Sequence, residues 1–505
     1  MADDSSFTMA VPNEEALRQF AADFASALAP GDVVALAGDL GSGKTTFARA
    51  LIRQLANDDM LEVPSPTFTL QQAYELPRFS LIHADFYRVS EPGEFAELGF
   101  DDLPPGAVVL VEWPERAQSL IPRDRWEITF TLNPEAGPDH RDVQVSGLGT
   151  YQARAARLVA RQRFLDESGY EQALSQPLAG DASTRSYQRL WLGDKSFIFM
   201  DSPHRADGPP VRDGKSYSAI AHLAEDVKAF VAIARALRGV GFSAPDIFAA
   251  DLEAGFVVLE DLGSELMVAG DPPAPIKLRY EAAVHILATL HKLNLPAKLP
   301  VAPHVEYRLP PYDTDAFLIE SELLLDWYLP HRGVVASAEA RDEYVQHWRA
   351  LLEPVLAQPK TWVLRDFHSP NLMWLPERRG IACLGIIDFQ DALIGPAAYD
   401  LASLLQDARV DVPEAMELDL MGRYVRARSI ADPKFDVPQF AQIYSTLAAQ
   451  RACKILGIFA RLDRRDGKPQ YLRHLPRVWG YVQRSLRHPA LAPLAAWYQQ
   501  HVPPP

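Results

Sequence analysis

The chain has little cysteine: Cys383 and Cys453 are the only two among 505 residues. Both lie in apolar surroundings, so a disulfide framework and a cysteine-based metal site are excluded. Long apolar runs are also missing, since none reaches the roughly 18 residues that a membrane-spanning helix needs. The N-terminal stretch MADDSSFTMA is acidic and lacks the basic-then-apolar order of a signal peptide. We therefore expect a cytoplasmic protein that does not bind a membrane.

Lysine is scarce in the first part of the chain. Residues 1–150 hold one Lys and nine Arg against 24 acidic residues, so this part carries −14 of the total charge of −16. An acidic domain repels a phosphate backbone, and we expect it to reach a nucleic acid only through a partner protein. A surface that is acidic for solubility alone explains the same charge.

The length and the hydrophobic patterns predict more than one domain. Residues 1–150 alternate amphipathic helices with short apolar strands, among them VVALAGD, FSLIHADF and AVVLVEW, which is typical of an α/β fold with parallel strands. WEITFTL and RDVQVSGL predict a closing β-hairpin. Residues 151–262 predict a helix and a small antiparallel sheet, and residues 263–505 a mainly helical lobe. We expect disorder in DGPPVRDGKS, residues 207–216.

The stretch GDLGSGKT, residues 38–45, matches the phosphate-binding loop G-x-x-x-x-G-K-[ST] between a predicted strand and a predicted helix. Its glycines allow main-chain N–H groups to surround an anion, Lys44 would reach the β- and γ-phosphates of ATP, and the Thr45 hydroxyl would bind Mg²⁺. Asp85, at the end of another predicted strand, is the second candidate ligand for Mg²⁺. We assign nucleotide binding to Gly38, Gly41, Ser42, Gly43, Lys44, Thr45 and Thr46.

Three further motifs accompany this loop: SPTFTL (65–70), HADFYR (83–88) and VEWPER (111–116). Together the four motifs resemble TsaE, the ATPase subunit of the bacterial machinery that makes threonylcarbamoyladenosine in tRNA. The resemblance implies slow ATP hydrolysis in a complex with TsaB- and TsaD-like partners, which would contact the tRNA. It places Thr67 near the γ-phosphate, gives Glu112 a catalytic role and puts Trp113 beside the nucleotide. From the residues alone, Glu112 is equally well explained as structural, and a Trp at such a position is more often a core residue than a ligand contact.

A second phosphate site is predicted at VLRDFHSPNLMWL, residues 363–375. Asp366 and Asn371 have the D-x-x-x-x-N spacing of kinase catalytic loops, in which the Asp orients or deprotonates the acceptor hydroxyl and the Asn binds Mg²⁺. Asp388, in IIDFQDALIGP, occupies the place of the kinase aspartate that binds Mg²⁺ across the β- and γ-phosphates. VVLEDLG, with Glu260 and Leu262, resembles an interlobe hinge whose main chain could pair with adenine. YDLASLLQDAR (399–409) predicts a helix that supports the site.

These features resemble the aminoglycoside phosphotransferase and choline kinase superfamily, which implies a bilobal α+β kinase-like fold. More narrowly, GDASTRSYQR (180–189), FMDSP (199–203) and LPPYD (309–313) resemble AmgK-type kinases, as do ESELLLDWYL (320–329) and RDFHSPNLMWL (365–375). Those enzymes phosphorylate N-acetylmuramate and N-acetylglucosamine at the anomeric hydroxyl during cell-wall recycling.

Two positions depart from the kinase pattern. Leu364 stands where the catalytic loop usually has His, and Met200 stands where a strand lysine usually pairs with the phosphates. Lys195, Arg185 or the Ser183-Thr184 turn could replace that lysine, although Lys195 is equally well explained as an exposed strand-end residue.

Candidate substrate contacts are Glu320, Trp327 and Tyr328 on one predicted helix, where LLLDWYL is also explained by core packing. Two alternatives to the sugar kinase stay open: phosphorylation of an aminoglycoside or another small alcohol, and a weakly catalytic nucleotide-binding interaction module.

Overall fold

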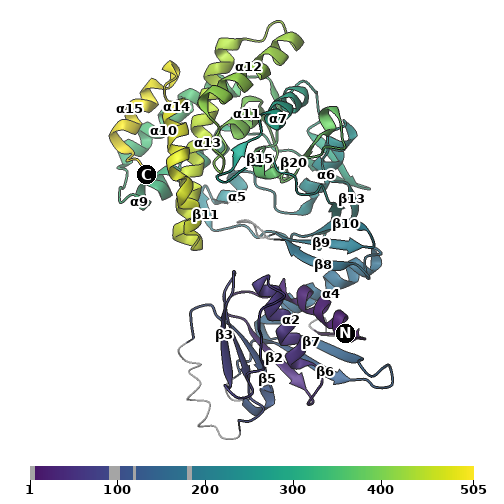
Figure 1. Ribbon diagram of the computed structural model, residues 1–505. Helices are drawn as coiled ribbons and strands as arrows, with labels where there is room; N and C mark the ends of the chain where they lie inside the picture. Colours follow the sequence, from purple (N-terminus) through teal and green to yellow (C-terminus); the bar gives the residue numbers. More distant parts are fainter. Residues whose placement is uncertain (1–5, 90–102, 118–120, 179–184) are drawn as a thin grey trace. The chain divides into compact units, whose positions relative to one another are not determined.

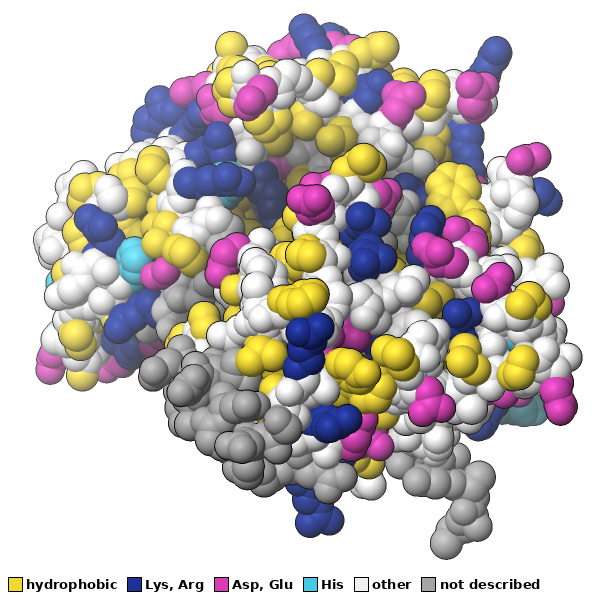
Figure 2. Space-filling model, turned by 60° about the horizontal axis from the view of Figure 1, so that its bottom comes forward, with side chains coloured by type: hydrophobic (Ala, Val, Ile, Leu, Met, Phe, Trp, Pro, Cys, Tyr) yellow, Lys and Arg dark blue, Asp and Glu magenta, His cyan; other side chains and the backbone are white. Residues whose placement is uncertain are grey.

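The computed structural model describes residues 6–89, 103–117, 121–178 and 185–505. Two compact units make up the chain. One consists of residues 1–203 with 249–258, and the other of residues 204–248 with 259–505. No helix in the described ranges is long and apolar enough to cross a membrane. Basic and acidic side chains lie among one another on the face that Figure 2 shows.

A mixed seven-stranded sheet forms the centre of the phosphate-binding-loop domain, in the order β1-β7-β6-β2-β5-β4-β3 (Figure 1). The four adjacent strands β6, β2, β5 and β4 run parallel, and the hairpin predicted from WEITFTL and RDVQVSGL is the antiparallel pair β6–β7. The strands are β1 (Ser6–Val11), β2 (Val33–Gly38), β3 (Gln71–Glu75), β4 (Ser80–Asp85), β5 (Val108–Glu112), β6 (Arg125–Leu132) and β7 (Arg141–Leu148).

Two amphipathic helices, α1 (Glu14–Ala25) and α2 (Lys44–Ala56), pack against each other and complete this core. The Asn13 side chain caps α1 by accepting the Ala16 N–H at 2.9 Å, which satisfies one of the N–H groups that a helix start leaves unpaired. Phe20, Phe47 and Trp126 lie in the buried core between the helices and the sheet.

Helix α4 (Gln152–Glu167) contributes to two hydrophobic cores. Ala155 and Leu158 belong to the core of the seven-stranded sheet, whereas Leu165 belongs to the core of a second, five-stranded sheet. That sheet has the order β13-β14-β10-β9-β8. Its strands are β8 (Leu174–Leu178), β9 (Ser186–Leu192), β10 (Lys195–Asp201), β13 (Ile247–Asp251) and β14 (Phe256–Glu260). The boundary predicted at residue 150 therefore falls directly before a helix that both sheets use.

Arginines along α4 reinforce both contacts. Arg154 donates to Asp32 of the first sheet at 2.7 and 2.6 Å, while Arg157 binds Asp201 of the second. The buried Arg161 donates to the Ser26 hydroxyl at 2.9 Å. The helix thus binds both sheets by apolar packing and by charge.

The rest of the chain is mainly helical, as predicted. Its helices are α5 (Tyr217–Ile220), α6 (Val227–Gly239), α7 (Lys277–Leu290), α8 (Thr314–Ser321), α9 (Leu329–His331), α10 (Ala338–Leu356), α11 (Ala398–Leu405), α12 (Glu414–Ala431), α13 (Val437–Asp466), α14 (Leu475–Ser485) and α15 (Ala492–His501). The long helix α13 packs along α11 and α14 (Figure 1). It is capped by the Asp436 side chain and ends at Gly467, whose φ of 63° favours glycine.

Short strand pairs connect these helices and carry the second site. They are β15 (Val268–Ala269) with β16 (Ala274–Pro275), β17 (Lys298–Ala302) with β18 (Val305–Arg308), β19 (Lys360–Val363) with β22 (Leu393–Pro396), and β20 (Leu372–Trp374) with β21 (Leu384–Ile386). The predicted catalytic loop leaves β19 and enters β20.

The expectation of disorder at residues 207–216 is wrong. This segment forms a hairpin of β11 (Pro210–Arg212) and β12 (Lys215–Ser216). Asp207 accepts hydrogen bonds from the hydroxyls of Ser216 and Ser218, and Arg212 pairs with Glu322 at 2.7 Å. The ion pair of Arg212 with Glu322, 110 positions later, and the hydrogen bonds of Asp207 hold this polar stretch in place. The composition of the stretch alone does not reveal these contacts.

Candidate active sites

The glycines of the first loop are required by its backbone. Gly38 ends β2 with φ at 131°, and a Cβ atom there would lie 2.3 Å from the main-chain oxygen of Phe130. Gly43 has φ at 111° directly before α2. Both conformations are strained for other residues, so the loop must use glycine to turn from strand into helix.

Lys44 lies buried within this loop. Its ammonium donates to the main-chain oxygens of Gly38 and Asp39 at 2.7 and 2.9 Å, and lies 3.8 Å from the ring centroid of Trp113. Burial lowers the pKa of Lys44, and nearby carboxylates, Glu112 first among them, oppose this shift. Trp113 is therefore positioned directly against the predicted phosphate-binding lysine.

The predicted polar groups gather at the carboxyl ends of β4 and β5. Asp85 and Glu112 are paired in register on these parallel strands. The Thr45 hydroxyl donates to Glu112 Oε2 at 2.8 Å, and the Thr67 hydroxyl donates to Asp85 Oδ2 at 2.7 Å. Mg²⁺ prefers oxygen ligands such as hydroxyls and carboxylates, so these four side chains fit the binding of a nucleotide with its magnesium ion.

The remaining loop residues differ in exposure. The Ser42 hydroxyl is buried and has no hydrogen-bond partner among the described residues, whereas Gly41 is exposed and Thr46 is half-buried at the start of α2. A buried hydroxyl without a partner suits a loop that binds a polar ligand.

His83 was not predicted as a site residue. Its Nε2 lies 2.9 Å from Glu112 Oε1, and both side chains are almost fully buried. The other ring nitrogen, Nδ1, has no partner among the described residues. His83 and Thr45 together occupy both oxygens of Glu112. A polar residue inside the apolar run LIHAD was the only signal in the sequence.

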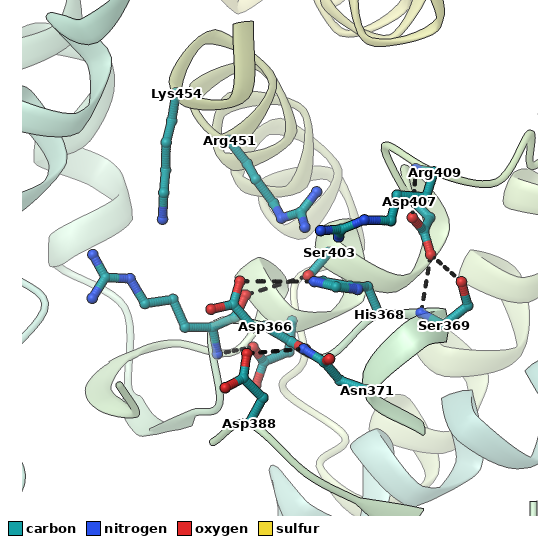
Figure 3. Close-up of polar contacts among 12 residues, drawn as sticks. Asp366, His368, Ser369, Asn371, Asp388, Ser403, Asp407, Arg409, Arg451 and Lys454 are labelled. Atoms are coloured by element: carbon teal, nitrogen blue, oxygen red, sulfur yellow. Dashed lines mark hydrogen bonds and ion pairs between the residues drawn. The ribbon is translucent and has the colours of Figure 1, made fainter. Parts of the chain in front are cut away.

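The structure brings Asp366, Asn371 and Asp388 together (Figure 3). The Asn371 amide donates to the main-chain oxygen of Asp366 at 3.0 Å and to Asp388 Oδ2 at 3.4 Å. Gln390 donates to the other oxygen of Asp388 at 3.0 Å. The amide and the carboxylate fit a magnesium site beside Asp366.

Asp400 of α11 holds the loop from within the core. Its fully buried carboxylate accepts the N–H groups of Leu364 and Arg365 at 2.7 and 2.8 Å. The Leu364 side chain is buried in the apolar core, whereas Arg365 has φ at 70° and donates to the main-chain oxygen of Ala221. Main-chain bonds to Asp400 therefore fix the loop, and Leu364 packs at the position where kinases usually have His.

Glu320, a predicted substrate contact, has no exposed surface. It accepts hydrogen bonds from Tyr312 and Gln450 and pairs with Arg365 and with Lys454, the latter at 2.8 Å. Burial opposes its charge, but the two cations outweigh burial and lower the pKa of Glu320 to about 2. The carboxylate therefore supports the catalytic loop through Arg365 and does not face a ligand.

The other predicted substrate residues lie on a π-helical turn, residues Leu324–Tyr328, after α8. Tyr328 is fully buried and its hydroxyl donates to the main-chain oxygen of Pro503. Trp327 is partly exposed, so it alone of the three predicted substrate contacts has a surface that a ligand could reach.

The predicted hinge residues are tied into their surroundings. The carboxylate of Glu260 binds Arg238 at 3.0 Å and Arg378, and Leu262 is buried. These contacts fix the segment that was predicted to bind adenine.

Met200, at the place of the phosphate-pairing lysine, is buried in β10, and Lys195 is exposed at the start of that strand. Arg185 precedes β9 and lies close to the Tyr187 hydroxyl, whereas Ser183 and Thr184 lie outside the described residues.

Two cations that the sequence did not reveal, Arg451 and Lys454, extend from α13 toward Asp366 (Figure 3). Desolvation raises the pKa of Asp366, but Lys454, His368 and Arg365 together lower it below its ordinary value. The residue is therefore ionised at neutral pH, as a base or an orienting group must be.

Two family models match the chain. Residues 11–142 match "Threonylcarbamoyl adenosine biosynthesis protein TsaE", and residues 175–436 match "Phosphotransferase enzyme family". The two matched ranges contain the phosphate-binding loop and the segments that carry Asp366, Asn371 and Asp388, whereas Arg451 and Lys454 lie beyond the second range.

Curated relatives divide in the same way. An N-acetylmuramate/N-acetylglucosamine kinase of Caulobacter vibrioides is 39% identical over 360 residues, which cover 69% of this chain and 97% of that protein. A kinase of the same name from Pseudomonas aeruginosa is 35% identical, over 63% of this chain and 86% of the relative. The tRNA threonylcarbamoyladenosine biosynthesis protein TsaE of Rickettsia bellii is 39% identical over 24% of this chain and 83% of its own length. The chain therefore belongs to the TsaE family in its first part and to the phosphotransferase enzyme family in its second.

Proposed function

We propose that the second part of the chain transfers the γ-phosphoryl group of ATP to the anomeric hydroxyl of N-acetylmuramate or N-acetylglucosamine in cell-wall recycling. One observation carries the proposal: Asp366, Asn371 and Asp388 meet at one site in a chain of which 69% is similar to nearly the whole length of a kinase named for these two sugars. The kinase-like part would consist of residues 151–262 and 263–505.

Within this proposal, the ionised Asp366 orients or deprotonates the anomeric hydroxyl. That hydroxyl is more acidic than an ordinary alcohol, so Asp366 needs only modest help from its neighbours to act as a base. Asn371 and Asp388 hold Mg²⁺, which neutralises charge on the phosphates when it is bound. The main chain at Glu260 and Leu262 binds adenine, and Trp327 is the remaining candidate for stacking on the sugar ring. Asp400 keeps the loop in position through two hydrogen bonds to its main chain.

We propose further that residues 1–150 hydrolyse ATP in threonylcarbamoyladenosine synthesis, together with TsaB- and TsaD-like partner proteins. Lys44 binds the phosphates, Thr45 and Asp85 hold Mg²⁺, and Thr67 lies near the γ-phosphate because it is bonded to Asp85. Glu112 serves the attacking water and Trp113 lies beside the nucleotide. The tRNA is reached through the partners, and all of these steps belong in the cytoplasm.

One experiment separates the two activities. The protein is incubated with MgATP and a panel of amino sugars and aminoglycosides, and phosphorylated acceptor and free phosphate are measured for wild type, Asp366→Asn and Lys44→Ala. We expect Asp366→Asn to lower sugar phosphorylation by about 10²-fold or more and to leave acceptor-independent ATP hydrolysis intact. Lys44→Ala should lower acceptor-independent ATP hydrolysis and leave sugar phosphorylation intact.

The panel also decides between acceptors. If no sugar is phosphorylated by the wild type, the sugar-kinase assignment is wrong, and phosphorylation of an aminoglycoside alone would establish the alternative acceptor. If Lys44→Ala abolished both activities, the two sites would not be separate.

A further inference from the structure

Arg451 and Lys454 lie on one face of α13, because residues three apart on a helix are neighbours. Both side chains extend from the helix toward the loop that holds Asp366 (Figure 3). Neither residue is part of the D-x-x-x-x-N loop or of the segment that carries Asp388.

Arg451 is a buried cation with few partners. The residue is buried, with a relative exposure of 6%. Within the described part of the chain, its guanidinium donates one hydrogen bond, to the main-chain oxygen of Gln406 at 3.2 Å, and forms no ion pair with a carboxylate. A guanidinium has five N–H donors and is always charged, and a buried charge without a counter-ion is costly. The side chain is therefore suited to an anionic ligand.

The carboxylates near Arg451 are bound by other groups. Lys454 pairs with Glu320 at 2.8 Å, and Arg365 pairs with the same carboxylate. Asp388, beside Asp366, accepts hydrogen bonds from Asn371 and Gln390. Within the described residues, none of these carboxylates forms an ion pair with Arg451. Asp407 and Arg409, on the far side of His368, contribute one charge of each sign (Figure 3).

We propose that Arg451, supported by Lys454, binds a carboxylate of the sugar acceptor and so distinguishes an acidic amino sugar from a neutral one. This inference rests on the proposed function. N-Acetylmuramate carries a lactyl carboxylate that N-acetylglucosamine lacks, and a guanidinium binds a carboxylate through two parallel hydrogen bonds.

The transferred phosphoryl group offers anionic oxygens as well, and the two sources of charge make different predictions. An arginine that binds the acceptor carboxylate matters for N-acetylmuramate only. An arginine that binds the phosphoryl group, or that only supports the fold, matters equally for both sugars.

The test is the ratio of kcat/KM for N-acetylmuramate to kcat/KM for N-acetylglucosamine in each variant. The ratio is measured on one preparation, so a smaller fraction of folded enzyme cancels. We expect Arg451→Gln to lower the ratio about 10- to 100-fold, the effect of losing a hydrogen-bonded charge pair, with less than about a threefold change for N-acetylglucosamine. The methyl ester of N-acetylmuramate should behave as the neutral sugar does.

Arg451→Lys keeps the positive charge but cannot form the two parallel hydrogen bonds of a guanidinium, so its ratio should fall between those of wild type and Arg451→Gln. It also provides a folded variant if Arg451→Gln is insoluble. Arg464→Gln, an exposed arginine of the same helix, is the matched control and should leave the ratio unchanged. An equal loss for both sugars, or an unchanged ratio in Arg451→Gln, overturns the inference while the proposed function stands. A wild type that phosphorylates neither sugar overturns both.

Discussion

At the residue scale, Glu320 shows how a buried ionised group can serve a loop that it does not belong to. It pairs with Arg365 beside the catalytic Asp366 and with Lys454 on α13. Removing one partner of a buried ion pair leaves the other charge uncompensated, which typically costs about 3–5 kcal/mol. The Glu320 carboxylate should therefore matter for stability and, through Arg365, for the position of the catalytic loop.

We predict that Glu320→Gln lowers the free energy of unfolding at pH 7 by about 3–5 kcal/mol. The folded pKa of Glu320, about 2, lies below its ordinary value of 4.5. The ionised group therefore contributes stability above about pH 4.5, and this contribution is lost as the pH falls toward 2. Urea unfolding of wild type and variant should show a gap that narrows between pH 4.5 and pH 3.

Glu343→Gln, an exposed glutamate of α10, is the control and should unfold like wild type at every pH. A gap for Glu320→Gln that stayed constant with pH would contradict the ionised pair.

The sequence predicts single residues well where spacing encodes chemistry. Lys44 and Thr45, and the trio of Asp366, Asn371 and Asp388, follow from motifs whose geometry is local or shared by many enzymes. The structure brings the three residues of the trio together. His83 and Arg451 were missed because their neighbours, Glu112 and the 366 loop, come from distant parts of the chain.

At the element scale, α4 has two apolar contacts in succession. Its first half packs into the core of the seven-stranded sheet through Ala155 and Leu158. Its second half packs against the five-stranded sheet through Phe164 and Leu165. The amphipathic pattern of YQARAARLVARQRFLDE predicts the helix, but not that it has a buried surface toward two sheets.

We predict that Leu158→Ala lowers the temperature of heat inactivation of both activities, ATP hydrolysis and sugar phosphorylation. The substitution removes buried methyl groups and typically costs about 2–5 kcal/mol. Because the helix continues into the second sheet, loss of its position should destabilise that sheet as well. Residual activities after heating at a series of temperatures provide the measurement.

Leu418→Ala, a 55% exposed leucine of α12, is the matched control and should change neither midpoint. If Leu158→Ala shifted the midpoint for ATP hydrolysis alone, the two sheets would unfold separately.

Strands could be predicted where their own sequence is apolar, and they were missed where they depend on pairing or contacts with other segments. β2, β4 and β5 each contain an apolar run that is largely buried, so their sequences reveal them. β1 was not predicted, because its short sequence SFTMAV becomes a strand by pairing with β7, which lies 130 or more residues later in the chain. The hairpin at residues 210–216 likewise depends on contacts with Asp207 and Glu322.

At the scale of the whole molecule, the net negative charge is concentrated in the first 150 residues, which carry −14 of the total of −16. We predict that the protein alone gives no mobility shift of tRNA at about 50 mM salt, because binding a phosphate backbone requires several cationic contacts. A shift that disappeared as salt was raised would contradict a partner-dependent route to tRNA. A basic protein that is known to bind tRNA would serve as the positive control.

The helix shared by the two sheets also has a consequence for the life of the protein in the cell. A protease that captures the chain when α4 is displaced would find both sheets loosened together. The two enzymes would then share one half-life as well as one polypeptide. Degradation, like synthesis, would set the supply of tRNA modification and of sugar phosphorylation as a single quantity.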